Sequence, residues 1–289
     1  MNSALEGIRR AGLEPLPANA RREHSDTGRI IARVHSDDYS RELEHACLSG
    51  REFFHSYDNP ISSDSYAAAR AVVSLALHAA SDVWDGPEGS RAFVVARPPG
   101  HHALATEAMG FCFFNTIACV AESLLERPGI ERVFIFDWDV HHGNGTQELF
   151  ETRPDVFYAS MHHYPFYPGT GAASERGRGA GDGYTRNVPL GGSSGDSIYL
   201  QALERIILPA IDEYEPHAIL ISAGFDAHYR DPLGGMRVTE NAFGEMTRRI
   251  TEAAARHGGG RILSLLEGGY DPEGLAASVK HHAEALAEG

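Results

Sequence analysis

The chain has 289 residues, of which 42% are hydrophobic and 22% charged, a composition that is typical of a folded globular protein and argues against disorder. Its formal net charge of −15 argues against direct nucleic-acid binding and favours cationic partners, although the same charge also serves solubility alone. The three cysteines lack a CxxC spacing, which argues against a disulfide framework and a cysteine zinc site. The absence of a signal peptide or a membrane-length apolar run predicts a soluble cytoplasmic protein without membrane contact.

Short apolar runs alternate along the chain with longer amphipathic stretches. In chain order we expect helices at 4–11 and 65–84, a strand at 91–96, a helix at 116–126, strands at 132–136 and 156–161, a helix at 196–214, a strand at 218–222, a helix at 240–257, a strand at 261–266 and a helix at 273–287. The strands are nearly continuous apolar runs, which suits a parallel sheet covered on both faces. The alternation therefore predicts an α/β fold, a single domain over residues 1–289 with helices flanking a central, mostly parallel sheet.

Polar residues cluster directly after each predicted strand. The clusters cover 97–102, 137–145, 162–163, 223–228 and 267–270. Open parallel sheets bind ligands at the carboxyl ends of their strands, so these segments are expected to converge. The sequence therefore predicts one functional site at that edge of the sheet.

The segment DWDVHH after the second of these strands carries residue types that bind metals. In extended geometry Asp137, Asp139 and His141 share one face, and carboxylates beside an imidazole form half of a metal site. A tetrahedral catalytic metal needs a third protein ligand and one open position, for which Asp226 is the best candidate. The alternatives are a solvated strand end for the first group and an ordinary helix N-cap for Asp226.

Tandem histidines follow a Pro-Pro-Gly turn at another strand end. Asp137 can hold one imidazole and Asn144 the other, which would push the pKa values of His101 and His102 apart and separate acid from base roles. Tyr270, after two glycines at the last strand end, offers a hydroxyl that can donate to a developing oxyanion. Surface histidines and a buried structural tyrosine are the plainer interpretations.

Seven segments together resemble the histone deacetylase superfamily, which includes acetylpolyamine amidohydrolases and acetoin-utilisation proteins. The segments are RPPGHHA, GFCFFN, DWDVHHGNGTQ, YPGTG, NVPL, SAGFDAHYRDPLGG and EGGY. The resemblance runs from about Tyr57 to the C-terminus, and GFCFFN and HHGNG look closer to class II and bacterial members. It implies a fold related to arginase, with the active site at the C-terminal ends of the strands. The first strand of the family is expected to be absent here.

The resemblance also implies roles for individual residues. Asp139, His141 and Asp226 match the ligands of a catalytic Zn²⁺, for which iron(II) or cobalt(II) are alternatives. His102 matches the general base and His101, paired with Asp137, its electrostatic partner, with Asn144 and Tyr270 completing the catalytic set. The walls of a narrow substrate tunnel are matched by Asp58, Gly110, Phe111, Phe166, Tyr167 and Leu233.

Two structural K⁺ sites are implied in the same way. The first is matched by Asp137, Asp139, His141, Ser160 and Met161, and the second by Phe150, Arg153, Val156 and Tyr184.

The activity implied is hydrolysis of the amide of an acetylated amine such as acetyl-lysine. The sequence leaves open acetylpolyamines and other small acetyl amides as substrates. Less favoured alternatives are a two-metal ureohydrolase, which needs further bridging carboxylates, and a non-catalytic acyl-lysine-binding protein. The sequence does not indicate an oligomeric state.

Overall fold

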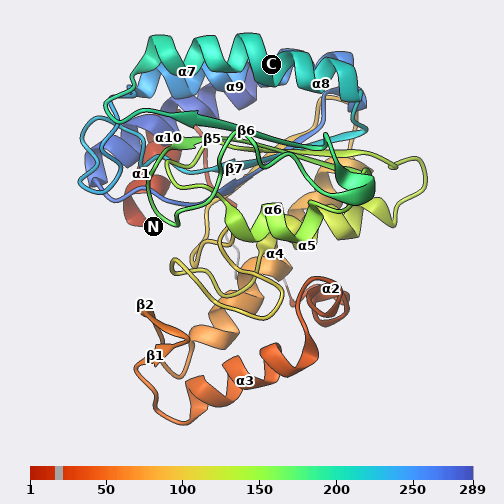
Figure 1. The fold of residues 1–289 in the computed structure, drawn as a ribbon, viewed down its shortest axis with the longest axis vertical. Coiled ribbons are helices and arrows are strands. Elements are labelled where there is room, and N and C mark those ends of the chain that lie inside the picture. The colour runs from red at the N-terminus through yellow and green to blue at the C-terminus, as the bar shows by residue number, and fades with distance from the viewer. Residues whose placement is uncertain (17–21, 289) are drawn as a thin grey trace.

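A six-stranded sheet, in which every neighbouring pair of strands is parallel, forms the centre of the protein (Figure 1). The computed structural model describes residues 1–16 and 22–288. The strands follow one another in space in the order β3-β8-β7-β4-β5-β6. Their bounds are β3 Arg91–Val94, β4 Val133–Asp137, β5 Val156–His163, β6 Thr185–Leu190, β7 Ala218–Ala223 and β8 Ile262–Leu266. Because parallel strands all end at one edge, the loops that follow them meet there.

Helices cover both faces of this sheet. One face packs against α1 (Asn2–Arg10), α7 (Asp196–Ala202), α8 (Leu208–Tyr214), α9 (Glu240–Arg256) and α10 (Pro272–Glu288). The other face packs against α4 (Ser65–Asp85), α5 (Thr116–Leu125) and α6 (Asn144–Phe150), and α2 (Thr27–Val34) and α3 (Asp37–Leu48) pack in turn against α4 and α5. Figure 1 shows the layers edge-on, with α7, α8 and α9 on one side of the sheet and α5 and α6 on the other.

Successive residues of β4 illustrate how the two cores form. Phe134 and Phe136 point into the core beneath α7 to α10, whereas Val133 and Ile135 point into the core beneath α4 and α5. All four side chains are fully buried. Side chains alternate between the two faces of a strand, and burying each one contributes roughly 1.5–3 kcal/mol. The apolar run of β4 is therefore the sequence signature of a strand that lies between two helical layers.

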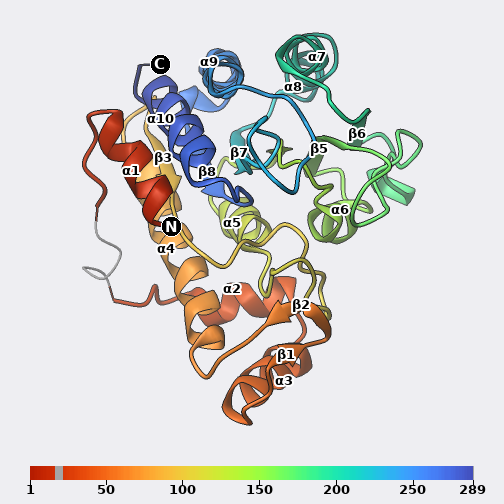
Figure 2. The same cartoon turned by 90° about the vertical axis from the view of Figure 1, so that its left-hand side faces the viewer.

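A short antiparallel hairpin, β1 (Phe53–Phe54) and β2 (Ser56–Pro60), reaches the site from the N-terminal part of the chain. It lies with α3 at the end of the molecule opposite α7 and α9 (Figure 2). Asn59 Nδ2 donates to the carbonyl of Ala108 at 2.8 Å, and Asn59 Oδ1 accepts from Phe111 N at 2.9 Å. The hairpin thereby anchors a loop that, as described below, forms one wall of the site.

All five predicted strands are confirmed, to within two residues at each end. The sixth strand, β6, was not predicted from the sequence. It pairs only with β5 at the edge of the sheet and carries polar residues and Pro189, so it lacks the apolar run of a central strand. At the other edge, β3 pairs only with β8 among the described residues.

The predicted helices are also present, with one difference in continuity. The stretch expected as one helix from 196 to 214 is interrupted by a π-helical segment, Leu203–Ile207, immediately before Pro209. Helices α2, α3 and α6 were not predicted, although Ser36 caps α3 by accepting from Tyr39 N at 3.2 Å. Within residues 1–16 and 22–288, no helix is both long and apolar enough to cross a membrane.

Candidate active site

Loops from the ends of β4 and β7 bring together two aspartates and a histidine. Asp139, His141 and Asp226 each offer one ligand-type atom, and these atoms all lie within 4.8 Å of one another. His141 Nδ1 lies 3.1 Å from Asp139 Oδ1 and 3.1 Å from Asp226 Oδ2. The sequence prediction named the same three residues, and the structure brings them into one cluster.

The extended backbone expected for residues 137–141 is not present. β4 ends at Asp137, so the extended geometry expected to place Asp137, Asp139 and His141 on one face does not continue beyond it. The chain turns instead, and Asp139 Oδ1 accepts from His141 N at 2.9 Å. Asp137 is not part of the cluster of three and pairs with His101.

The carboxylate environment fits a divalent cation. Asp226 Oδ2 is buried and has no hydrogen-bond partner, although the other oxygen of that carboxylate accepts from Val140 N at 2.9 Å. A Cβ atom on Gly268 would lie 2.2 Å from Asp226 Oδ2 and 2.6 Å from Asp139 Oδ2, so only glycine leaves room for the two carboxylates. Two aspartates and an imidazole with one unsatisfied oxygen form a donor set of the kind that catalytic metals occupy.

Ionisation within the cluster is strongly coupled. Burial raises the pKa of Asp226 to about 6, and repulsion by Asp139 adds to this effect. Burial alone would lower the pKa of His141, but its hydrogen bond to Asp139 and its close contact with the Asp226 carboxylate outweigh burial and raise the pKa to about 10. Two carboxylates this close favour a positive charge between them, which is the electrostatic condition for binding a cation.

The two tandem histidines lie side by side, with ring centroids 4.0 Å apart, but have different partners. His101 Nδ1 lies 3.0 Å from Asp137 Oδ2, and its Nε2 lies 3.9 Å from Asp139 Oδ1. Burial alone would lower the pKa of His101, but the charges of Asp137 and Asp139 raise it to about 10. The two carboxylates therefore favour the charged form of His101.

His102 lies in the opposite electrostatic situation. Its Nδ1 is 2.8 Å from Asn144 Oδ1, which can only accept, so Nδ1 carries the proton and Nε2 is left as the acceptor. Burial, together with His101 and His141, holds the pKa of His102 well below its ordinary value. The neighbouring rings therefore present one charged and one neutral imidazole to the same cavity, with the partners expected from the sequence.

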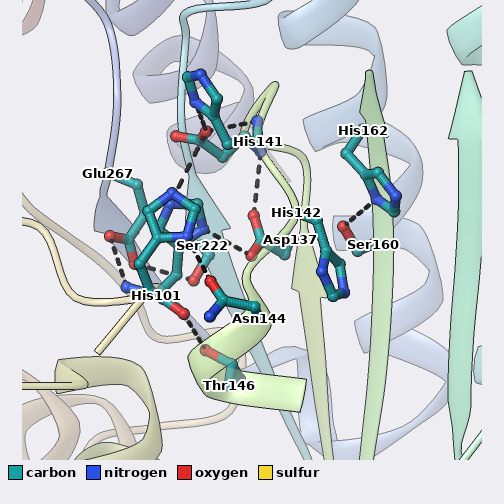
Figure 3. A network of polar contacts seen from close by, with 12 residues as sticks. His101, Asp137, His141, His142, Asn144, Thr146, Ser160, His162, Ser222 and Glu267 are labelled. Atoms are coloured by element: carbon teal, nitrogen blue, oxygen red, sulfur yellow. Dashed lines mark hydrogen bonds and ion pairs between the residues drawn. The ribbon is translucent and has the colours of Figure 1, made fainter. Parts of the chain in front are cut away.

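A further buried acid, Glu267, for which the sequence predicted no role, supports the histidine turn. Glu267 Oε2 accepts from Gly100 N at 2.7 Å and His101 N at 3.3 Å, and Oε1 accepts from Ser222 Oγ at 3.0 Å. Burial raises the pKa of Glu267 to about 7. The glutamate joins the ends of β3, β7 and β8, as the contacts of Glu267 and Ser222 in Figure 3 show.

His142, adjacent to the proposed metal ligand His141, points away from the cluster. Its Nδ1 lies 2.8 Å from Thr170 Oγ1 and its Nε2 lies 2.9 Å from Gln147 Oε1. Its ring lies 4.8 Å from that of His162, which contacts Ser160 Oγ at 2.9 Å (Figure 3). These buried imidazoles support the loop that follows β5 rather than the cavity.

A narrow cavity of about 230 Å³ leads to the histidines and the cluster of ligands. Its walls are mostly apolar, and they include Asp58, Gly110, Phe111, Tyr167, Leu233 and Tyr270. Phe166 was expected among them but is not a lining residue. Its ring stacks on His163 at 4.2 Å and on His141 at 5.6 Å, behind the wall that Tyr167 forms.

Polar contacts hold the entrance of this cavity, and an aromatic contact lies on its wall. Asp58 Oδ2 accepts from Tyr167 OH at 2.9 Å and from Gly110 N at 3.1 Å, which joins hairpin β1–β2 to both sides of the entrance. The Tyr270 ring lies 6.3 Å from that of Phe111. Burial raises the pKa of Tyr270 above its ordinary value, so its hydroxyl remains a proton donor.

The residues matched to potassium sites lie in two places along β5. Asp137 and Ser160 are register partners across β4 and β5, next to Met161. Near the beginning of β5, the carbonyl of Phe150 accepts from Arg153 N at 2.9 Å, and the carbonyl of Tyr184 accepts from Tyr158 N at 3.0 Å.

The chain matches a known protein family over nearly its whole length. The family model described as "Histone deacetylase domain" matches residues 1–286. The histone deacetylase-like amidohydrolase of Pseudomonas aeruginosa is 45% identical over 241 residues, 83% of this chain and 63% of that protein. A probable deacetylase of Archaeoglobus fulgidus is 40% identical over 244 residues, 84% of this chain and 67% of that protein.

A solved structure gives the same result for the fold. The crystal structure of the HDA15 HD domain superimposes with a TM-score of 0.90 at 35% identity, covering 99% of this chain and 80% of that one. The alignment to the Pseudomonas relative spans less than two thirds of that protein's length. The chain belongs to the histone deacetylase family.

Proposed function

We propose that this chain is a metal-dependent deacetylase that hydrolyses the amide of an acetylated amine, with the acetyl-lysine side chain as its substrate class. The observation that carries the proposal is the pair of unlike imidazoles beside the cluster of Asp139, His141 and Asp226 at the inner end of a narrow cavity. A neutral base, a charged neighbour and a cation site within one cavity are the groups that amide hydrolysis requires.

Asp139, His141 and Asp226 would hold the metal, with Zn²⁺ as the first choice and iron(II) or cobalt(II) as alternatives. A metal bound there would act as a Lewis acid on the amide carbonyl and lower the pKa of a water molecule. Structural K⁺ is assigned to the two sets of residues along β5. The other residues of the site transfer protons and form the walls of the cavity.

His102 is assigned as the general base. Its Nδ1–H donates to Asn144, so its Nε2 is free to accept the proton of the attacking water and then to return it to the leaving amine. His101 lies between Asp137 and Asp139 and keeps its proton, which adds positive charge beside the oxygen that becomes negative. Tyr270, on the wall of the same cavity, donates a hydrogen bond from its hydroxyl to that oxygen.

The shape of the cavity supports an unbranched substrate. Phe111, Tyr167 and Leu233 enclose it with apolar surface that suits the methylene chain of a lysine. Asp58 presents a carboxylate at the entrance, and the net charge of −15 attracts a basic peptide over longer distances.

Two other functional hypotheses have less support. A ureohydrolase uses two metals with bridging carboxylates, but the part of the chain that the structure describes contains a single group of three such ligands. A non-catalytic binding protein would not need a neutral base beside a charged histidine. The residues matched to catalysis are all present here.

The test is a panel assay on metal-depleted protein to which Zn²⁺, Fe²⁺ or Co²⁺ is returned. Acetyl-lysine peptides, acetylpolyamines and small acetyl amides are the substrates, and Asp226→Asn is compared with the distant control Asp212→Asn. We expect metal-dependent release of acetate from the peptides, lost in the first variant and kept in the second. Full activity in strong chelator would refute the metal mechanism, and turnover of polyamines alone would refute the substrate class.

A further inference from the structure

Tyr270 follows two glycines that cannot hold it in place by themselves. Gly269 has a φ of +135°, a conformation that other residues rarely adopt, and Gly268 lies against the carboxylates of Asp139 and Asp226. Glycine has the greatest backbone freedom of any residue. The close approach that the glycines permit therefore leaves the following tyrosine dependent on contacts from elsewhere in the molecule.

The side chain of Asp231 supplies such contacts. Asp231 Oδ2 accepts from Tyr270 N at 2.7 Å and from Asp271 N at 3.2 Å, while Oδ1 accepts from Leu233 N at 2.9 Å. The residue is buried, and all three donors are backbone amides. Hydrogen bonds to an ionised acceptor are about twice as strong as neutral ones.

These donors come from two loops that both contribute to the cavity wall. Leu233 lies in the loop after β7, and Tyr270 lies in the loop after β8. Both side chains line the cavity of about 230 Å³. One carboxylate therefore sets the relative position of a substrate-contacting wall and of the hydroxyl assigned to the oxyanion.

A role in capping α10 does not account for this arrangement. The N-terminus of α10 already has its own acceptor, because Asp271 Oδ1 accepts from Gly274 N at 2.7 Å. Asp271 Oδ1 also accepts from Arg230 Nε at 3.1 Å. Asp271 therefore serves the helix end, and the Asp231 carboxylate is available to bind the two loops. Asp231 is not a member of the metal-ligand cluster.

We propose that Asp231 is a positioning residue that places the Tyr270 hydroxyl for catalysis by tying the Tyr270 backbone to the Leu233 loop. The inference rests on the proposed deacetylase function. It predicts that the two residues act as one unit, so that removing Asp231 matters only while the Tyr270 hydroxyl is present.

The first experiment is a double-mutant cycle with D231N and Y270F. Asparagine preserves the shape but offers one acceptor oxygen, so one of the two connections is lost. We expect D231N to lower kcat about 10- to 100-fold with KM changed less than about 3-fold, and to change kcat less than about 3-fold when added to Y270F. Asp196→Asn is the matched control, because Asp196 also accepts a backbone amide, from Thr239 N at 2.7 Å, and neither residue lines the cavity. Equal losses from D231N in both backgrounds would overturn the proposal.

The second experiment needs no variant and no activity. Amide hydrogen exchange of the wild-type protein should show Tyr270 N–H protected although it lies in no helix or strand. Exchange of that amide at the rate of an open loop would overturn the proposal, even if D231N did not fold. Protected exchange together with a wild-type protein that cleaves no acetyl amide would refute the proposed function and leave the structural tie intact.

Discussion

Replacing Gly268 by alanine is expected to destroy metal binding while leaving the fold in place. The added Cβ would lie 2.2 Å from Asp226 Oδ2 and 2.6 Å from Asp139 Oδ2, whereas ordinary contacts begin at 3.4 Å. The two carboxylate oxygens must therefore retreat by roughly 1 Å each, far beyond the tolerance of about 0.2 Å in metal–ligand distances. Gly268 does not have a positive φ, so the effect arises from this contact and not from backbone strain.

The magnitude follows from the number of ligands that are disturbed. Loss of a residue that only supports a ligand costs about 10- to 100-fold in metal affinity. Displacing two of three ligands should cost at least the upper end of that range, which corresponds to roughly 2.7 kcal/mol. The assay is titration of metal-free protein with Zn²⁺ in competition with a chromophoric chelator, with circular dichroism as the check on folding.

Gly191→Ala is the matched control, because nothing lies within 4 Å of the added methyl group and its φ is unexceptional. It should bind metal like the wild type. If Gly268→Ala also binds Zn²⁺ with wild-type affinity, the carboxylates are not a closely spaced ligand pair, and the assignment of Asp139 and Asp226 fails.

Four further substitutions test other parts of the site and fold. Tyr270→Phe should keep folding and metal binding but lower kcat about 100- to 1000-fold, and a wild-type rate would make the phenol merely structural. His102→Ala should abolish turnover while His101→Ala weakens it and shifts the pH profile of kcat/KM; the reverse order would exchange their roles. Burial lowers the pKa of His282 to about 3, against about 6.5 when unfolded, so the free energy of unfolding should fall by about 1.4 kcal/mol per pH unit from pH 6 to 4. Urea titrations of His282→Gln should show a shallower slope, and an unchanged slope would contradict this.

The sequence predicted the central strands because their burial produces a pattern that can be read locally. β4 and β7 are apolar at almost every position since both faces are covered. β6 escaped prediction because it lies at the edge, where Asn187 and Pro189 are tolerated. Hairpin β1–β2 is held by side chains such as Asn59 that bond to a distant loop, which no periodicity reveals.

The residues of the site also divide into those that a local sequence pattern reveals and those that only distant contacts define. His101, His102 and Asp139 stand out because ligand-type residues gather at strand ends. Glu267 and Asp231 did not receive a role, since each has a key contact with a backbone amide distant in sequence, 167 residues away for Glu267 and Gly100 and 39 for Asp231 and Tyr270. Two adjacent aromatic residues, Phe166 and Tyr167, could not be separated by composition alone. Only the turn that follows β5 determines which of them faces the cavity.

The long sequence separations within the site have a consequence for how the protein folds. Asp139 Oδ2 accepts from Gly268 N, 129 residues further along the chain, and the two aspartates of the cluster come from different strand ends. Contacts of this kind form late, after the entropy of closing long loops has been overcome. Helical signal in a refolding chain should precede its ability to capture a metal ion. Metal uptake therefore reports the assembly of the three strands β4, β7 and β8, whose ends carry these residues.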